Sequence, residues 1–478
     1  MRSLAAVTLA FVLSGGWLFA QDDGLNPAGP LYMLNNGDRL MSASSQGLPG
    51  EISQLNFGPG TVPLFSFIRE LDGTTTLHIL NYLDNELVTV EPAVGNGPAD
   101  GLSTATYDGQ LSWRPQLDRQ GRQWFAFVSN KLDNNQEIYL GYLGGEEYVR
   151  LTRNSANDFS PQWSPDGDKI AFISKRSGEG DLYLSQSLEK VVDGKSRPSA
   201  FIHRQLTDTP LAEAQPAWNP NPKAHLIAFT QRRQFAGRDV ATTQIAIIDL
   251  GSESFDLYEV TADPLYHFYA PNWEPHSARR LMFVQQSVVQ GTTAGIYLVE
   301  LEWKGGKLHN KILEDYRTEI FDKALLGQGR QKWLAGGSGI ICQKDSTNAN
   351  NPLFSIDVDR WLAKKEGAVN EMADVNQQYA RISEFDIRGN DMMLVDRSYG
   401  NDEIFWIKVE GSAIRANQEP DYQLDNPGQG PKALLSVNPY VIATGTVAAG
   451  VLTYFLLSDG NNDEPGPQPI GRPPGLPR

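Results

Sequence analysis

The sequence predicts an all-β protein built from repeated units of four short antiparallel strands, and three observations support this prediction. The 478 residues include 45 glycines and 29 prolines, with 10 tryptophans and 17 tyrosines, a composition typical of strands and tight turns. A Trp-x-Pro motif recurs about every 50 residues, and an apolar segment with a phenylalanine follows each copy. Four short strands in a unit of this length are typical of a β-propeller blade.

The repeat is clearest in four consecutive copies, whose tryptophans are separated by 50, 55 and 55 residues. A Leu-Thr or Val-Thr pair lies eleven or twelve residues before three of them, and a second short strand follows each phenylalanine strand after a polar loop. The four tryptophans are Trp113, Trp163, Trp218 and Trp273. We interpret each as a large apolar wedge between neighbouring blades, with stacking on a ligand as the alternative.

Weaker copies of the repeat flank these four. Anchors near residues 57, 333 and 385 add three further units. The sequence therefore predicts seven blades within residues 31–415, or six if the first or last unit is a closing fragment. Residues 360–378 interrupt the last blades with a helix-like pattern, which predicts an excursion on one face.

One copy is more complete than the others. Ser164-Pro165-Asp166-Gly167 supplies a tight turn, because proline fixes φ at its second position and glycine ends it. Together with Leu151-Thr152 and Lys169-Ile-Ala-Phe172, this turn resembles the repeat of TolB-like periplasmic propellers, also found in the propeller domains of prolyl-oligopeptidase-type peptidases. The resemblance implies the propeller class. The separate amino-terminal α/β domain of TolB is not expected, since about ten residues separate the predicted leader from Leu31.

The two ends differ from the body. Residues 1–20 have the layout of a secretory signal peptide, with an uncleaved signal anchor as the alternative. After a linker at 416–433, residues 434–457 are apolar and long enough for one membrane helix, the alternatives being a buried helix or a cleaved sorting tail. Residues 458–478 form a proline-rich tail, either disordered or a polyproline ligand. We therefore expect an exported periplasmic or cell-envelope protein, anchored by 434–457.

Composition also excludes several functions. A formal net charge of −16 opposes nucleic-acid binding and suggests a basic or cationic partner. Cys342 is the single cysteine, which leaves no disulfide or CxxC metal site and suggests a small buried side chain. The six histidines show no HExxH spacing, and fewer than 70 residues follow the seventh unit, too few for a serine hydrolase domain. We expect no metal and no cofactor.

One polar position recurs five residues before the tryptophan. It is occupied by Asp108, Asp158 and Glu213, each just ahead of the predicted innermost strand of its blade. Our hypothesis is that these acids belong to a ring of carboxylates at the channel mouth, able to hold a cation or the basic end of a peptide. The alternative is a solvated or turn-capping role, since such side chains commonly bond nearby backbone amides.

These observations predict an envelope-tethered propeller that acts as a protein–protein interaction scaffold. Envelope lipoproteins, peptidoglycan-associated proteins or a secretion complex are the partners that the resemblance implies. No catalytic residue is assigned. The alternative is a propeller-type lyase or glycosidase acting on an extracytoplasmic polysaccharide, which a cluster of carboxylates in the channel would favour.

Overall fold

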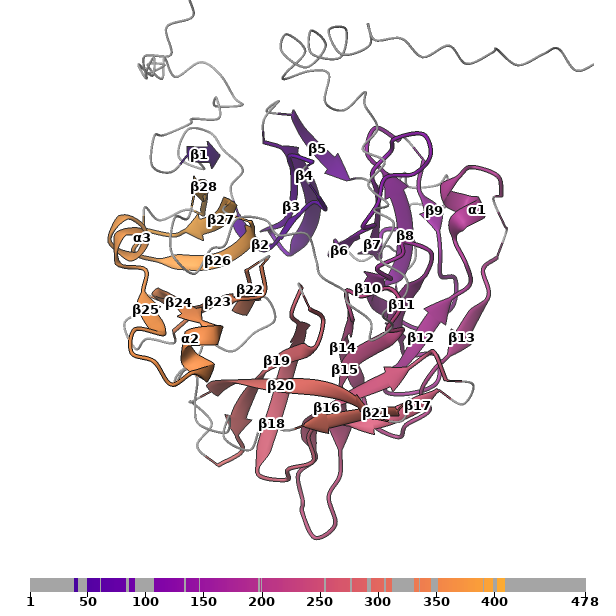
Figure 1. Cartoon of the computed structure of the whole chain (residues 1–478). Coiled ribbons are helices and arrows are strands. Elements are labelled where there is room, and N and C mark those ends of the chain that lie inside the picture. Colours follow the sequence, from indigo (N-terminus) through magenta and orange to yellow (C-terminus); the bar gives the residue numbers. More distant parts are fainter. Residues whose placement is uncertain are drawn as a thin grey trace, which may run out of the picture. The chain divides into compact units, whose positions relative to one another are not determined.

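The structure is a computed structural model that describes residues 38–41 and, with short gaps, residues 50–90, 107–311 and 331–408. In these residues the chain forms seven antiparallel sheets of four strands each, arranged around a common centre (Figure 1). Seven blades, not six, are therefore confirmed. The predicted signal peptide (1–20), linker (416–433), membrane helix (434–457) and tail (458–478) lie outside the described residues.

The blades follow one another in chain order. Blade 1 contains β2 (Glu51–Phe57), β3 (Leu64–Leu71), β4 (Thr74–Asn81) and β5 (Glu86–Val90). Blade 2 contains β6 (Asp108–Trp113), β7 (Trp124–Ser129), β8 (Glu137–Tyr142) and β9 (Val149–Arg150). Blade 3 contains β10 (Asp158–Trp163), β11 (Ile170–Ser174), β12 (Asp181–Ser185) and β13 (His203–Gln205). Blade 4 contains β14 (Glu213–Trp218), β15 (Leu226–Arg233), β16 (Thr242–Asp249) and β17 (Asp256–Glu259).

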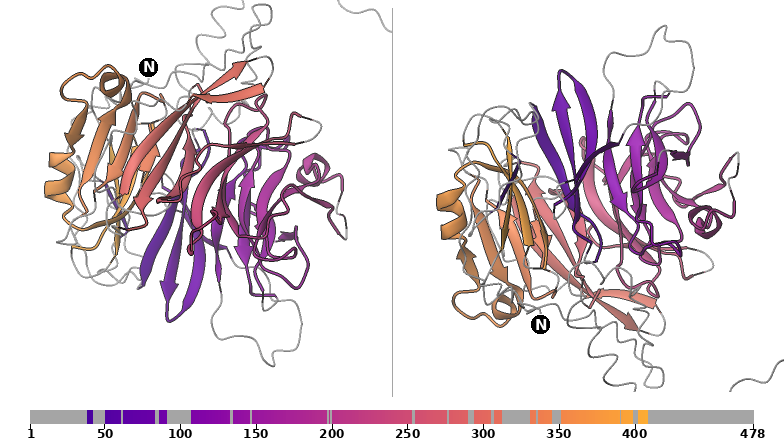
Figure 2. Two further views of the ribbon diagram at one scale, coloured as in Figure 1. Left: turned by 90° about the horizontal axis from the view of Figure 1, so that it is seen from below. Right: turned by 90° about the horizontal axis from the view of Figure 1, so that it is seen from above.

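The remaining blades have the same order. Blade 5 contains β18 (Tyr266–Trp273), β19 (Arg280–Ser287), β20 (Ala294–Lys304) and β21 (Lys307–Lys311). Blade 6 contains β22 (Gln331–Trp333), β23 (Gly339–Gln343), β24 (Leu353–Asp357) and β25 (Val369–Glu371). Blade 7 contains β26 (Ile382–Arg388), β27 (Asp391–Asp396), β28 (Glu403–Lys408) and β1 (Asp38–Met41). The first three strands of each blade follow one another outward from the centre, and two turned views show the blades side by side (Figure 2).

The ring is closed by a strand from the beginning of the described chain. β1 pairs antiparallel with β28, so the outermost strand of blade 7 comes from the N-terminal side of blade 1. Pairing this N-terminal strand with the last three strands in one sheet leaves the ring without a free end. The closure has no signal in the sequence, because a four-residue strand carries no motif of its own.

Each interface between neighbouring blades is called a seam here and is named by its two blades. At four seams a repeat tryptophan donates its indole N–H to a backbone carbonyl of the preceding innermost strand. The acceptors are Asn56 O for Trp113 (3.4 Å), Gln162 O for Trp218 (3.0 Å), Ala217 O for Trp273 (3.0 Å) and Asn272 O for Trp333 (3.1 Å). The tryptophans are thus wedges between blades, as predicted, and each also bonds across its seam.

The Leu-Thr and Val-Thr pairs have an equally local explanation. In three blades the threonine hydroxyl accepts a hydrogen bond from a backbone N–H of the third strand of the same blade. The pairs are Ile138 N with Thr152 (2.8 Å), Leu182 N with Thr207 (2.9 Å) and Ile245 N with Thr261 (2.8 Å). Each pair follows directly after the fourth strand, so the threonine fixes the exit of the chain toward the next blade.

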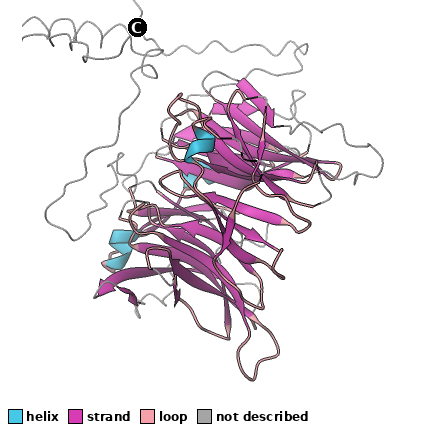
Figure 3. Ribbon diagram, turned by 90° about the vertical axis from the view of Figure 1, so that its right-hand side faces the viewer, coloured by secondary structure: helices cyan, strands magenta, loops and turns pink. Residues whose placement is uncertain are grey.

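Helices are short and lie at the outer rim of their blades (Figures 1 and 3). They are α1 (Glu189–Val192), α2 (Val358–Leu362) and α3 (Ala373–Gln378). The last two account for the excursion predicted at 360–378, although β25 lies between them and completes blade 6. The Asp357 carboxylate begins α2 by accepting a hydrogen bond from Arg360 N at 2.9 Å. Within the described ranges, no helix combines the length and apolarity needed to cross a membrane.

Candidate binding groove between blades 3 and 4

The acids predicted at the channel mouth begin innermost strands, but their side chains are buried. Asp108 and Asp158 are both 0% exposed. Lys131 Nζ lies 2.6 Å from the Asp108 carboxylate, and Arg176 Nη2 lies 2.9 Å from that of Asp158. Cations from their own blades therefore compensate both charges, as burial of an ionised group requires. Ligand binding by these acids stays a prediction.

Glu213 is also buried, at 2% exposure, and the groups that donate hydrogen bonds to it are neutral. Its carboxyl group accepts hydrogen bonds from Leu182 N at 3.0 Å, from the Thr207 hydroxyl, and from the Thr209 hydroxyl at 3.3 Å. Burial raises the pKa of Glu213 from 4.5 to about 7. This side chain bonds blade 4 to the third strand of blade 3 and is protonated in a large fraction of molecules near neutral pH.

Burial also shifts the pKa of three further titratable side chains of the described chain. Cys342 is fully buried, as expected, and burial raises the pKa of its thiol. Burial lowers the pKa values of His78 and His203 to about 4. Within the described ranges, no three histidine, cysteine, aspartate or glutamate side chains gather in a way that could hold a metal ion.

The residue directly after the repeat tryptophan contributes to closing three of the seams. At three seams this side chain reaches the first hairpin turn of the next blade. Arg114 Nε donates to Gly167 O at 2.9 Å, Asn219 Nδ2 donates to Ala278 O at 2.9 Å, and Glu274 packs so closely on Gly337 that a Cβ there would clash. These contacts cover seams 2/3, 4/5 and 5/6.

Blade 3 departs from this rule because its residue after the tryptophan is the short Ser164. The Ser164 hydroxyl donates to Asp166 Oδ1 at 2.5 Å and accepts from Lys169 N at 2.9 Å, so both bonds stay within its own turn. Seam 3/4 receives no side chain from this position. Trp218, which belongs to this seam, is accordingly only partly buried, whereas Trp163 and Trp273 are each 4% exposed.

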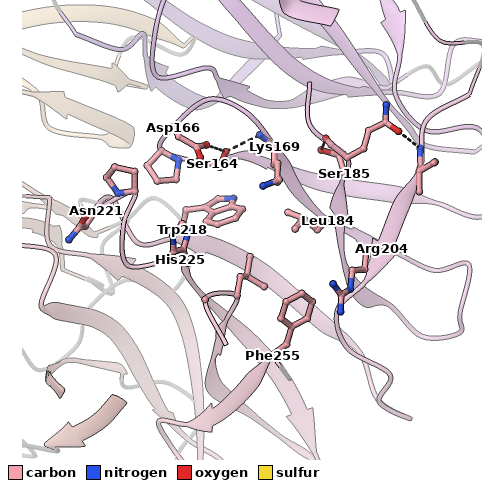
Figure 4. Close-up of a pocket in the computed structure, with 16 residues that line it drawn as sticks. Ser164, Asp166, Lys169, Leu184, Ser185, Arg204, Trp218, Asn221, His225 and Phe255 are labelled. Atoms are coloured by element: carbon pink, nitrogen blue, oxygen red, sulfur yellow. Dashed lines mark hydrogen bonds between the residues drawn. The ribbon is translucent and has the colours of Figure 1, made fainter. Parts of the chain in front are cut away.

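The open seam forms a groove of about 520 Å³ with Trp218 at its centre (Figure 4). We call it the 3/4 groove. Its lining residues come from the turns and strand ends of both blades: Ser164, Pro165, Asp166, Lys169, Leu184, Ser185, Gln186, Ile202, Arg204, Trp218, Asn221, Pro222, His225, Leu250, Gly251 and Phe255. Volume and lining match those of small-ligand and peptide sites, which are mostly apolar with a few polar groups.

Charge in the 3/4 groove is positive against the acidic background of the chain. Lys169 and Arg204 lie on different sides of it, and the Arg204 guanidinium stacks 3.8 Å from the centroid of the Phe255 ring (Figure 4). The lining carboxylate, Asp166, accepts hydrogen bonds from Ser164 and from Asp168 N at 3.1 Å, both in its own turn. Lys169 Nζ lies 3.8 Å from the Asp168 carboxylate, whereas Arg204 forms no ion pair with a carboxylate of the described residues. The lining itself therefore holds two cations against one carboxylate.

The groove was not predicted from the sequence, although a signal was present. Ser164 occupies the position that holds Arg114, Asn219 and Glu274 in the neighbouring repeats, and it is shorter than all three. Among the four clear copies of the repeat, a comparison of side-chain length at this position therefore indicates seam 3/4.

A closed ring of seven four-stranded blades defines the class: a β-propeller, here with a groove between blades 3 and 4. The repeat itself is TolB-like. Over 64 residues, 13% of this chain and 14% of that protein, it is 42% identical to the Tol-Pal system protein TolB of Desulfosudis oleivorans, which confirms the predicted resemblance. The uncharacterized peptidase YuxL of Bacillus subtilis is 25% identical over 236 residues, 47% of this chain and 29% of YuxL.

Among solved structures, the β-propeller domain of the Trilobed protease from Pyrococcus furiosus aligns with 78% of this chain and all of its own, with a TM-score of 0.47 and 12% identity. No family model matches the chain. The chain spans less than a third of the length of either curated relative. Activities and partners of those whole proteins are therefore not established for this chain.

Proposed function

We propose that this protein is an exported, envelope-tethered propeller that serves as a protein–protein interaction scaffold. The signal-peptide pattern of residues 1–20 and the TolB-like repeat support export. The apolar segment 434–457 supports the tether. The observation that carries the scaffold function is the 3/4 groove, where a partly exposed Trp218 lies beside two cations in a ring whose neighbouring seams are closed.

Affinity capture from detergent-solubilised envelopes tests this proposal. The baits are the full-length protein and a form that ends before Pro431, both checked for folding by circular dichroism. We expect one specific partner to be retained by both baits. A partner lost on truncation would move binding to the C-terminal segment, and capture of none would overturn the scaffold function.

The carbohydrate-active alternative is tested with the same protein. Release of unsaturated or reducing sugars from extracytoplasmic polysaccharides would replace the scaffold function by an enzymatic one. Because the sequence assigns no catalytic residue, this screen needs no active-site variant. A heat-unfolded sample serves as its control.

A further inference from the structure

We propose that the 3/4 groove binds an extended acidic peptide segment of the partner, with a proline or aromatic side chain seated on Trp218. This inference rests on the proposed scaffold function and names the chemistry of its partner. The net charge of −16 favours cationic partners for the body as a whole. The groove is a local exception, because two cations, Lys169 and Arg204, line it against the one carboxylate of Asp166.

Trp218 supplies a rigid platform. Its indole N–H is bonded to Gln162 O at 3.0 Å, which fixes the ring while one part of it remains accessible. Because the ring is already fixed, a side chain that stacks on it loses little further conformational entropy of the protein on binding. Leu184, Leu250 and Pro222 add apolar side chains to the lining of the groove. Proline and aromatic side chains fit such a surface because they bury a large rigid area at low entropic cost.

The cations select the charge of the segment. Lys169 approaches the groove from the turn of blade 3, and Arg204 approaches from β13 of the same blade (Figure 4). Arg204 is held in place by Phe255 of blade 4, so its guanidinium is already positioned for a carboxylate. Two cations on different sides of one aromatic platform match acidic residues that flank a central apolar one.

A peptide fits this site better than an acidic saccharide. Five of the sixteen lining residues are aliphatic or proline and eight carry polar side chains, so the feature that favours a peptide is the neighbouring sheet edge. β13 is also the edge strand of blade 3, and Arg204 belongs to it. An extended peptide can use a sheet edge for backbone hydrogen bonds, which a saccharide cannot do in register. Beside it, Ile202 is 76% exposed and offers further apolar contact.

Fluorescence anisotropy with a labelled peptide tests the inference on the full-length protein. The probe is Glu-Asp-Pro-Phe-Pro-Asp-Glu, and its neutral counterpart is Gln-Asn-Pro-Phe-Pro-Asn-Gln. We expect the acidic probe to bind at least about tenfold more tightly than the neutral one at low salt, with the difference shrinking as salt is added. Equal binding of both peptides, or no binding of the acidic one, would overturn the proposal.

Two variants locate the binding. Ser164→Arg gives blade 3 an arginine at the position where Arg114 closes seam 2/3. Lys169→Glu with Arg204→Glu reverses the charge of the two cations that line the groove. Each should weaken probe binding about tenfold or more. The control Lys364→Glu with Lys365→Glu makes the same change of net charge on exposed residues of blade 6 and should bind like the parent. If Ser164→Arg destabilises its turn, the comparison of the charge-reversal variant with its control tests the proposal by itself. Equal loss of probe binding in the charge-reversal variant and in the control would overturn the proposal.

Competition separates the other occupants. Displacement of the probe by oligogalacturonate at lower concentration than by unlabelled peptide would assign the groove to an acidic saccharide. Stronger displacement by a synthetic peptide of residues 459–478 would assign it to the chain's own tail; either result overturns a partner peptide. If the variant Lys169→Glu with Arg204→Glu still captures the envelope partner, the scaffold function is supported but the 3/4 groove is not its binding site.

Discussion

Seams 7/1 and 3/4 are held together by different chemistry. At seam 7/1 the Asp386 carboxylate accepts a hydrogen bond from Phe57 N at 2.8 Å, while Lys332 Nζ of blade 6 lies 2.9 Å from its other oxygen. Asp402 repeats the arrangement, accepting from Ile52 N at 2.6 Å and pairing with Arg397 at 2.7 Å. The closing seam therefore depends on carboxylates that cations compensate.

At seam 3/4 the corresponding contacts are neutral. Trp218 donates its indole N–H across the seam, and Glu213 bonds to Leu182 N and two threonine hydroxyls. Blade 1 has Phe57 where blades 2 to 6 have tryptophan, so no indole bond can form at seam 7/1. Charged bonds take its place there, which teaches that a degenerate repeat is compensated at the seam where its motif residue is missing.

Removing Asp386 should break the closing seam with the largest effect. Asp386→Ala leaves the buried Phe57 N–H and the Lys332 ammonium without their acceptor, so we expect the free energy of unfolding to fall by about 4 kcal/mol. Denaturant unfolding followed by tryptophan fluorescence measures it. Asp374→Ala, at an exposed position on α3, is the control and should change stability by less than about 0.5 kcal/mol. Equal effects of the two variants would mean that the ion pair contributes nothing to closure.

The second prediction concerns pH and seam 3/4. Because burial raises the pKa of Glu213 from 4.5 to about 7, the folded state binds its proton more tightly than the unfolded state does. The resulting stabilisation is complete below pH 4.5 and is lost as pH rises to about 7, which amounts to about 3 kcal/mol. Glu213→Gln cannot ionise, so the parent should lose about this much stability relative to the variant across that interval.

Unfolding midpoints of parent and variant at several pH values from 4 to about 8 measure the difference. Glu366→Gln, an exposed change on blade 6, is the matched control and should follow the parent throughout. A constant difference between the parent and Glu213→Gln would show that Glu213 titrates in the folded protein as it does in the unfolded chain. The neutral character assigned to seam 3/4 would then be wrong.

The sequence predicted the ring much better than it predicted the groove. The Trp and Leu-Thr repeats are local patterns whose bonds recur in successive blades, so spacing alone located the blades. Asp108 and Asp158 pair with Lys131 and Arg176, each two residues after the serine that lies opposite the acid in the second strand. That repeated position is a sequence signal for the ion pairs, although no local pattern shows that the acids are buried. The pairing of β1 with β28 joins segments more than 350 residues apart. Such long-range contacts leave no periodic signal in one sequence.

The smallest predicted effect tests whether the indole bonds hold the seams. Trp163 and Trp273 are equally buried, but Trp273 Nε1 donates to Ala217 O, whereas Trp163 Nε1 has no hydrogen-bond partner among the described residues. Trp273→Phe should therefore cost about 1 kcal/mol more than Trp163→Phe, because only the former leaves a carbonyl without its donor. Thermal unfolding of both variants measures this difference. Equal losses of stability would mean that packing of the indole rings alone stabilises these seams. Seam 7/1 would then differ from them because ion pairs stabilise it, whereas apolar packing stabilises the others.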